Sequence, residues 1–135
     1  MGDQAGGVTD EHQVVLRIPA EGAYLSILRT TTAGLAARLD FTLDEIEDLR
    51  IAVDEACALL LPNARPDSDL MCEFAVGDDS LSVRVTTEST DPALPSQDGF
   101  SWTVLSALVS CVDAAIHQGG VSLTLTRQRG SRTAR

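Results

Sequence analysis

The hydrophobic positions of this chain change their spacing several times, and each spacing predicts one element. Every second residue from Val14 to Ile18 is apolar, which predicts a strand that ends at Pro19. Between residues 21 and 39 the apolar side chains recur at helical spacing, as on the buried face of a helix. They are Leu25, Leu28, Leu35, Ala36 and Leu39. A strand followed by an amphipathic helix is therefore expected at the start of the fold.

A second helix has its own start signal. Thr42-Leu43-Asp44-Glu45 is the pattern of a capping box, in which the Thr42 hydroxyl accepts from the Glu45 amide while the Glu45 side chain reaches back. An apolar stripe follows at Leu43, Ile46, Leu49, Val53 and Leu60. Pro62 ends the predicted helix, because proline lacks the amide hydrogen and clashes with the preceding turn.

Strand-like alternation returns after a turn-rich stretch at residues 63–69. Residues 70–76 and 81–85 both alternate, and Gly77-Asp78-Asp79 between them is a tight-turn signal, so a hairpin is expected. Residues 86–98 are polar, hold two prolines and predict a loop.

The last part of the chain predicts one more helix and one more strand. The helix is indicated by Phe100, Val104, Leu105, Leu108 and Val112. A turn at residues 117–120 then leads into a strand with Val121, Leu123 and Leu125.

The predicted order is β-α-α-β-β-α-β. Hairpin-linked strands mixed with helices favour an α+β fold, a two-layer sandwich with the helices on one face of a mostly antiparallel sheet. The length suits one domain, expected over residues 12–127. Residues 1–11 and 128–135 are expected to be flexible ends, since they are rich in glycine or polar side chains.

Composition narrows the choice of partner. The 135 residues carry a net charge of −10, which argues against direct binding to nucleic acid or an anionic membrane and leaves a basic protein partner open. No signal peptide or transmembrane run is visible, so a cytoplasmic location is expected. Cys57, Cys72 and Cys111 match no metal-binding spacing and are expected to be reduced there.

Three segments carry a family resemblance over residues 14–127. The first leads from Pro19-Ala20-Glu21 through Arg29 to Asp40, the second is Asp44 to Cys57, and the third is Gly99-Phe100-Ser101-Trp102-Thr103-Val104-Leu105. Together they resemble the anti-sigma factor and serine kinase branch of the histidine-kinase-like ATPases, and are most similar to the sigma-F regulators of actinobacteria. The resemblance implies the histidine-kinase-like ATPase fold.

The resemblance also implies a nucleotide site on the second helix. In the family a Glu acts as general base and an Asn four residues later ligates Mg²⁺ between the phosphates. Glu55 matches the Glu, but Leu59 stands at the Asn position and cannot hold Mg²⁺, and Asn63 lies one turn further on. Thr86 is expected where the family has the Asp that binds adenine.

The glycine motif that opens the third helix is only partly kept. Gly99 and Thr103 match it, whereas Ser101 replaces the second glycine, which normally lets the backbone approach a phosphate. Glu55, Leu59, Asn63, Thr86, Gly99, Ser101 and Thr103 therefore form a residual nucleotide site. The resemblance implies ATP and Mg²⁺ as cofactors, but these departures weaken both and argue against an enzyme; no other metal site is expected.

As to function, the resemblance implies an anti-sigma factor. It would hold a stress- or sporulation-type sigma factor away from RNA polymerase, work as a homodimer, and be released by an anti-anti-sigma protein. Arg29 matches the family's partner contact, and Leu25 and Thr32 lie beside it on the first helix. Two alternatives stay open: an active serine kinase that phosphorylates the anti-anti-sigma factor, and a thiol-based redox sensor of partner binding.

Overall fold

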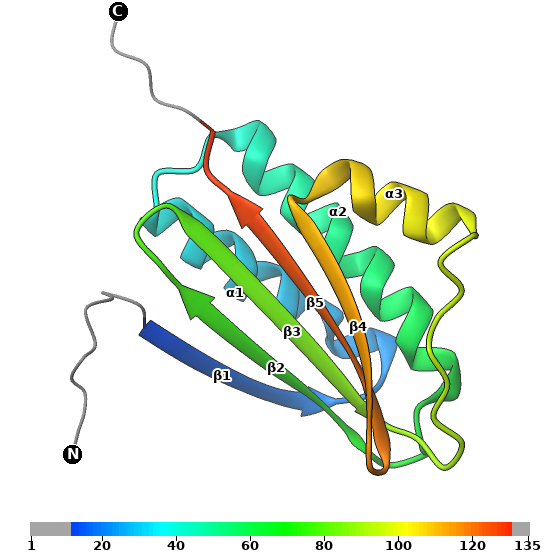
Figure 1. Cartoon of the computed structure of the whole chain (residues 1–135). Coiled ribbons are helices and arrows are strands. Elements are labelled where there is room, and N and C mark those ends of the chain that lie inside the picture. The colour runs from blue at the N-terminus through cyan, green and yellow to red at the C-terminus, as the bar shows by residue number, and fades with distance from the viewer. Residues whose placement is uncertain (1–11, 131–135) are drawn as a thin grey trace, which may run out of the picture.

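Three α-helices cover one face of a single antiparallel sheet, whose other face is open (Figure 1). The computed structural model describes residues 12–130. The strands, in the spatial order β1-β2-β3-β5-β4, are β1 (His12–Pro19), β2 (Asp69–Val76), β3 (Ser80–Glu88), β4 (Cys111–His117) and β5 (Gly120–Gln128). The helices are α1 (Leu25–Arg38), α2 (Leu43–Leu60) and α3 (Phe100–Leu108). The two-layer α+β fold is thereby confirmed.

Strand β4 is an addition to the predicted order. The apolar spacing predicts a helix through Val112, but α3 ends at Leu108 and the chain turns into an edge strand that pairs with β5. The run Val112 to Ile116 contains two alanines, which favour helix by propensity, yet pairing with a neighbouring strand overrides that preference. Gly119, with φ of +83°, makes the tight turn from β4 to β5.

The core lies between the sheet and the helices. The inward positions of the three central strands are fully buried: Leu70, Cys72, Phe74, Leu81, Val83, Val85, Leu123 and Leu125. They form one cluster with buried residues of the helices, among them Leu28, Leu49, Val53 and Ala56. No helix in the described part of the chain is long and apolar enough to cross a membrane.

The predicted capping box is confirmed at the start of α2. The Thr42 hydroxyl accepts from the Glu45 amide at 3.1 Å, and Glu45 Oε1 accepts from the Thr42 amide at 2.7 Å. The second oxygen, Oε2, accepts from the Gly130 amide at 2.5 Å. Glu45 thus accepts hydrogen bonds from the backbone of both Thr42 and Gly130, and it is almost completely buried.

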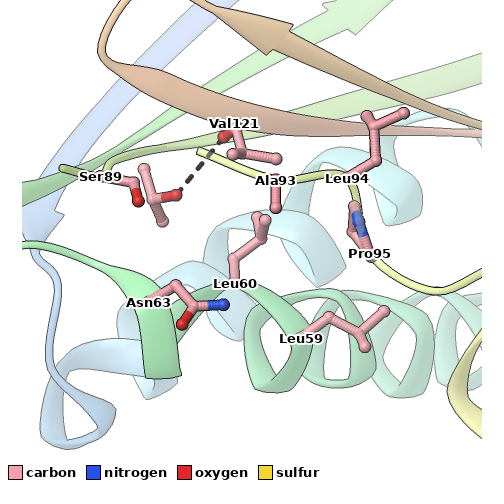
Figure 2. Close-up of a pocket in the computed structure, with 9 residues that line it drawn as sticks. Leu59, Leu60, Asn63, Ser89, Ala93, Leu94, Pro95 and Val121 are labelled. Carbon is pink, nitrogen blue, oxygen red and sulfur yellow. Dashed lines mark hydrogen bonds between the residues drawn. The ribbon is translucent and has the colours of Figure 1, made fainter. Parts of the chain in front are cut away.

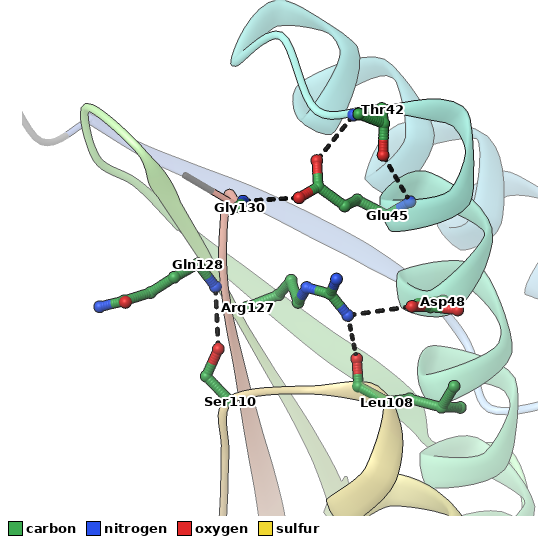
Figure 3. A network of polar contacts seen from close by, with 8 residues as sticks. All are labelled: Thr42, Glu45, Asp48, Leu108, Ser110, Arg127, Gln128 and Gly130. Carbon is green, nitrogen blue, oxygen red and sulfur yellow. Dashed lines mark hydrogen bonds and ion pairs between the residues drawn. The ribbon is translucent and has the colours of Figure 1, made fainter. Parts of the chain in front are cut away.

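Residues 127–130, here called the C-terminal clamp, fasten β5 to all three helices. Figure 3 shows the contacts with α2 and with the end of α3. Arg127 donates to the Leu108 carbonyl at 2.6 Å and to Asp48 Oδ2 at 3.0 Å. Arg129 donates to the Leu39 carbonyl at 2.9 Å. Both arginines thus satisfy carbonyl groups that a helix C-terminus leaves free.

The clamp also moves the end of the folded domain. The sequence places that end at residue 127, whereas Gln128, Arg129 and Gly130 donate backbone hydrogen bonds to Ser110, Asp79 and Glu45, respectively. Of the predicted flexible ends at 1–11 and 128–135, residues 1–11 and 131–135 lie outside the described residues.

The clamp makes a stability prediction. Replacing Arg127 by methionine keeps most of the side-chain length but removes both donors, so the free energy of unfolding in urea should fall by about 2 kcal/mol. Arg84→Met is the control, because Arg84 is 52% exposed and only meets Glu73 at 3.6 Å on the open sheet face. It should change stability by less than about 0.5 kcal/mol. Equal losses in the two variants would contradict a special role for the clamp.

Candidate functional site

The candidate nucleotide site is a small cavity between the end of α2, the adjoining ends of β3 and β5, and the loop before α3 (Figure 2). Its volume is about 70 Å³, several times less than the roughly 300 Å³ at which ligand pockets usually begin. Leu59, Leu60 and Val121 line one side, and Leu94 and Pro95 of the loop line the other. The chain's own apolar side chains thus occupy most of this region.

Leu59 and Asn63 both line this cavity. The side chain of Leu59 has no oxygen that could bind a cation. Asn63 ends a short 3-10 turn, Leu61–Asn63, that Pro62 imposes on the end of α2. Its side chain is exposed and also borders the outer hollow with Asp91. The predicted stop of α2 at Pro62 is therefore confirmed, and it takes Asn63 off the α-helical face that carries Glu55.

The structure brings Thr87, not Thr86, to the cavity. Thr86 pairs with Met71 and Ser122 and lies on the sheet face away from the helices, since side chains alternate along a strand. Thr87 is buried, lines the cavity and donates to the Val121 carbonyl at 3.4 Å. A shift of one residue exchanges the two faces, and the sequence alone does not fix that register. Sequence reasoning also missed buried Ser89, which no pattern marks.

Glu55 and Ser101 meet outside this cavity. The Ser101 hydroxyl donates to Glu55 Oε2 at 2.5 Å, which joins α2 to the first turn of α3. Gly99 precedes α3 as its N-cap, and the exposed Thr103 donates to the Gly99 carbonyl at 3.2 Å. Gly99, Ser101 and Thr103 therefore lie together at the start of α3. Glu55 of α2 contacts one of them, Ser101, through its side chain.

These residues do not fit Mg²⁺-ATP. The Glu55 carboxylate already accepts the Ser101 hydroxyl, and a leucine stands where the cation needs an oxygen ligand. The Thr87 hydroxyl is engaged with Val121, and the cavity is too small for a nucleoside. Within residues 12–130 no group of three or more His, Cys, Asp or Glu side chains is gathered to hold a metal ion.

The predicted partner contacts lie on α1. Arg29 is 35% exposed and forms an ion pair with Asp54 of α2, with 2.8 Å between Nε and Oδ1. Leu25 is half-buried against the core. Thr32 must be removed from the contact surface, because it is fully buried and donates to the Leu28 carbonyl. The helices instead expose large apolar side chains at Ile27, Leu43, Ile51 and Phe100, and Tyr24 is exposed just before α1. Leu43 and Phe100 are predicted on the apolar stripes of their helices, but as first residues of α2 and α3 they are 84% and 81% exposed.

Comparison with known proteins identifies relatives. No family model matches the chain. Serine-protein kinase RsbW of Bacillus velezensis is 39% identical over 83 residues, which cover 59% of this chain and 52% of that protein. For the Bacillus subtilis protein of the same name the identity is 38% over 78 residues, or 56% and 49% of the two chains. The match therefore spans about half the length of these Bacillus relatives.

A longer match is found in Mycobacterium tuberculosis. Its anti-sigma-F factor RsbW is 31% identical over 129 residues, which cover 88% of this chain and 76% of that protein. A solved structure of RsbU and RsbW domains from the same organism superimposes with a TM-score of 0.70 over 92% of this chain and 34% of that one. At 21% identity, that superposition shows the shared fold.

The three thiols differ in exposure. Burial raises the pKa of both Cys57 on α2 and Cys72 on β2 to about 12. Cys111 on β4 is exposed, but the negative charge of Asp113, whose Oδ2 lies 3.6 Å from Sγ, raises the pKa of this thiol as well. All three are therefore protonated near neutral pH, which argues against a reactive thiolate sensor.

This difference can be measured with a thiol reagent of the Ellman type. Native protein should react at Cys111 alone, unfolded protein at all three cysteines, and Cys111→Ser should abolish the native reaction. Since a raised pKa lowers the thiolate fraction, the rate should climb as the pH increases from about 7 to 9. Asp113→Asn should accelerate the reaction at pH 7, and Asp98→Asn, at the far end of α3, should not. Fast labelling of Cys57 or Cys72 in the folded protein would revive the redox alternative.

Proposed function

The chain belongs to the RsbW family, and from this premise we propose that it is an anti-sigma factor. It binds an alternative sigma factor of the sigma-F-like stress or sporulation type and keeps it from RNA polymerase in the cytoplasm. The observation that carries this proposal is the mycobacterial anti-sigma-F relative, which matches along most of both chains.

Release follows from competition. An anti-anti-sigma protein that covers an overlapping surface displaces the sigma factor by mass action, because the two complexes exclude each other. This mechanism needs no covalent step. It therefore agrees with a site in which the general-base position is already hydrogen-bonded and the cation position is a leucine.

The proposed contact surface is the outer side of α1 and α2 around Arg29. An arginine suits such a contact because its planar fork pairs with a carboxylate and tolerates partial loss of water. Its present partner is Asp54, so a carboxylate on the bound protein takes over or shares that ion pair. Ile51, three residues before Asp54 on α2, is exposed and adds apolar area on that side of the ion pair.

Serine kinase activity is the rival function. The names of the Bacillus relatives favour it, and Glu55 is at the position of the general base. The cavity volume, Leu59 and the Ser101–Glu55 hydrogen bond argue against it. We therefore place the activity of this chain in binding.

We also propose a homodimer formed through β1, which is an edge of the sheet. An edge strand offers unpaired backbone groups to a second copy. If two β1 strands pair antiparallel about Val15, that residue faces itself and Gln13 faces Arg17, so no like charges meet. Val15 is 57% exposed in the single chain. A groove of about 410 Å³ beside the strand, lined in part by Val14 and Leu35, leaves room for the partner's side chains.

The anti-sigma proposal is tested by capture followed by transcription. The native protein should retain a sigma factor from its source cells, identified by mass spectrometry, and should inhibit transcription by polymerase carrying that purified factor. Arg29→Glu should raise the Kd for the sigma factor at least about 30-fold, because it replaces a partly buried cation with an anion that repels the partner's carboxylate. Absence of any sigma factor with native protein would overturn the proposal.

Two further variants separate binding from folding. Arg29→Glu combined with Asp54→Arg rebuilds the internal ion pair with its charges exchanged, so the fold should recover while sigma binding stays weak. Arg84→Glu, on the open sheet face, should bind as the native protein does. Full binding by the exchanged pair would show that Arg29 is not itself a contact.

The dimer is tested at both edges of the sheet. Val15→Asp should convert the protein to a monomer in sedimentation equilibrium, because two carboxylates would then face each other. Ile116→Asp, on the opposite edge strand β4, is the matched control with a side chain that is 50% exposed, and it should remain dimeric. Dissociation by the Ile116 variant alone would assign the dimer to β4.

A further inference from the structure

One short hydrogen bond fastens the start of α3 to α2. The Ser101 hydroxyl and Glu55 Oε2 are 2.5 Å apart, and both residues are half-buried. A hydroxyl that donates to a carboxylate makes one of the stronger hydrogen bonds in proteins. This contact, here called the α2–α3 brace, joins residues 46 positions apart in the sequence.

We propose that the brace takes the place of a nucleotide in this chain, so that α3 is held on α2 without ATP. A glycine at position 101 would leave the Glu55 carboxylate without this donor. Here the serine hydroxyl engages that carboxylate. An incoming phosphate would have to break this hydrogen bond and then face the negative charge of Glu55 at close range.

The neighbouring cavity supports the same inference independently. Leu59, Leu94 and Pro95 enclose it with apolar side chains, and about 70 Å³ remain. Thr87, the polar group of β3 that points into it, already donates to Val121. The chain's own side chains thus leave little room inside this cavity, whereas the outer hollow of about 400 Å³ that shares Asn63 and Ser89 with it stays open.

The local structure at Gly99 does not require a glycine. Its φ is −87°, which any residue adopts, and a Cβ there would meet only Ser96 Oγ at 3.9 Å. The side-chain hydrogen bond that ties the start of α3 to α2 is the brace.

The regulatory consequence rests on the proposed anti-sigma function. If α3 and α2 are fixed internally, the surface on α1 and α2 is preformed and its affinity for partners does not vary with the ATP concentration. Exchange of the sigma factor then follows the amounts of the competing proteins alone.

Trp102, the only tryptophan of the chain, is next to Ser101 and packs partly against the core. Its fluorescence reports directly on the position of α3. Adding millimolar Mg²⁺-ATP to the native protein should change neither its emission nor the Tm, whereas a ligand at 100 times its Kd would raise the Tm by roughly 10 °C.

Serine variants test the brace itself. Ser101→Ala should lower the Tm by about 3–6 °C and make Trp102 more accessible to acrylamide quenching, because the hydroxyl donor is lost. Ser101→Thr keeps a hydroxyl and should restore both values. Ser106→Ala removes an exposed serine from the same helix and should behave as the native protein.

Two outcomes would overturn the inference. A saturable, Mg²⁺-dependent rise in the Tm of native protein would show that a nucleotide still binds. Unchanged Tm and quenching in Ser101→Ala would show that the brace does not hold α3. Neither measurement involves a partner protein. Both therefore test the brace whether or not a sigma factor is captured, and failure of the brace can be told apart from failure of the anti-sigma proposal.

Discussion

The whole helical layer depends on how the end of β5 returns to the helices. A single sheet with helices on one side has no second layer to fix their ends, so the fixing must come from the chain itself. Arg127 and Arg129 cap the C-termini of α3 and α1, and Gly130 donates to Glu45 at the start of α2. These contacts fix one end of each helix relative to the C-terminal end of β5. Apolar burial drives the layers together, but it is non-directional and would not choose this alignment.

Acidic side chains of α2 bind groups on the other helices and on the C-terminal clamp. Glu45 and Asp48 hold the C-terminal clamp, Asp54 holds Arg29 of α1, and Glu55 holds Ser101 of α3. Acids in the first turn of a helix complement its dipole, and for an exposed Asp44 that account suffices. For the others the partner is a specific group on another element. The strongly negative composition is thus partly structural.

Features whose partners are close in the sequence could be predicted from it, whereas features that depend on distant residues could not. The capping box at Thr42 was predictable because both its partners lie within four residues. The pairing of Arg29 with Asp54 spans 25 residues and carries no mark in the sequence. Strand β4 was missed because its alanines favour a helix until β5 offers pairing, and Thr87 was missed because a register shift of one residue is invisible in a short polar stretch. Thr32 lies four residues after buried Leu28 and four before buried Ala36, so its burial follows from the helical spacing of the apolar stripe.

Asp54 and Glu55 are adjacent, and about 100° of helical rotation separates their directions. One therefore reaches α1 and the other α3 from the same turn of α2. If a bound ligand, and not Ser101, held α3 on α2, this turn of α2 would be ordered only after the ligand had bound. The contact surface around Arg29 on α1 would then be fixed only in the ligand-bound protein. With Ser101 in that role the turn is ordered in the free chain, and none of the partner's binding energy is spent on arranging it. A binding protein that works by competition benefits from this arrangement, because its affinities then depend only on the contacts each partner makes.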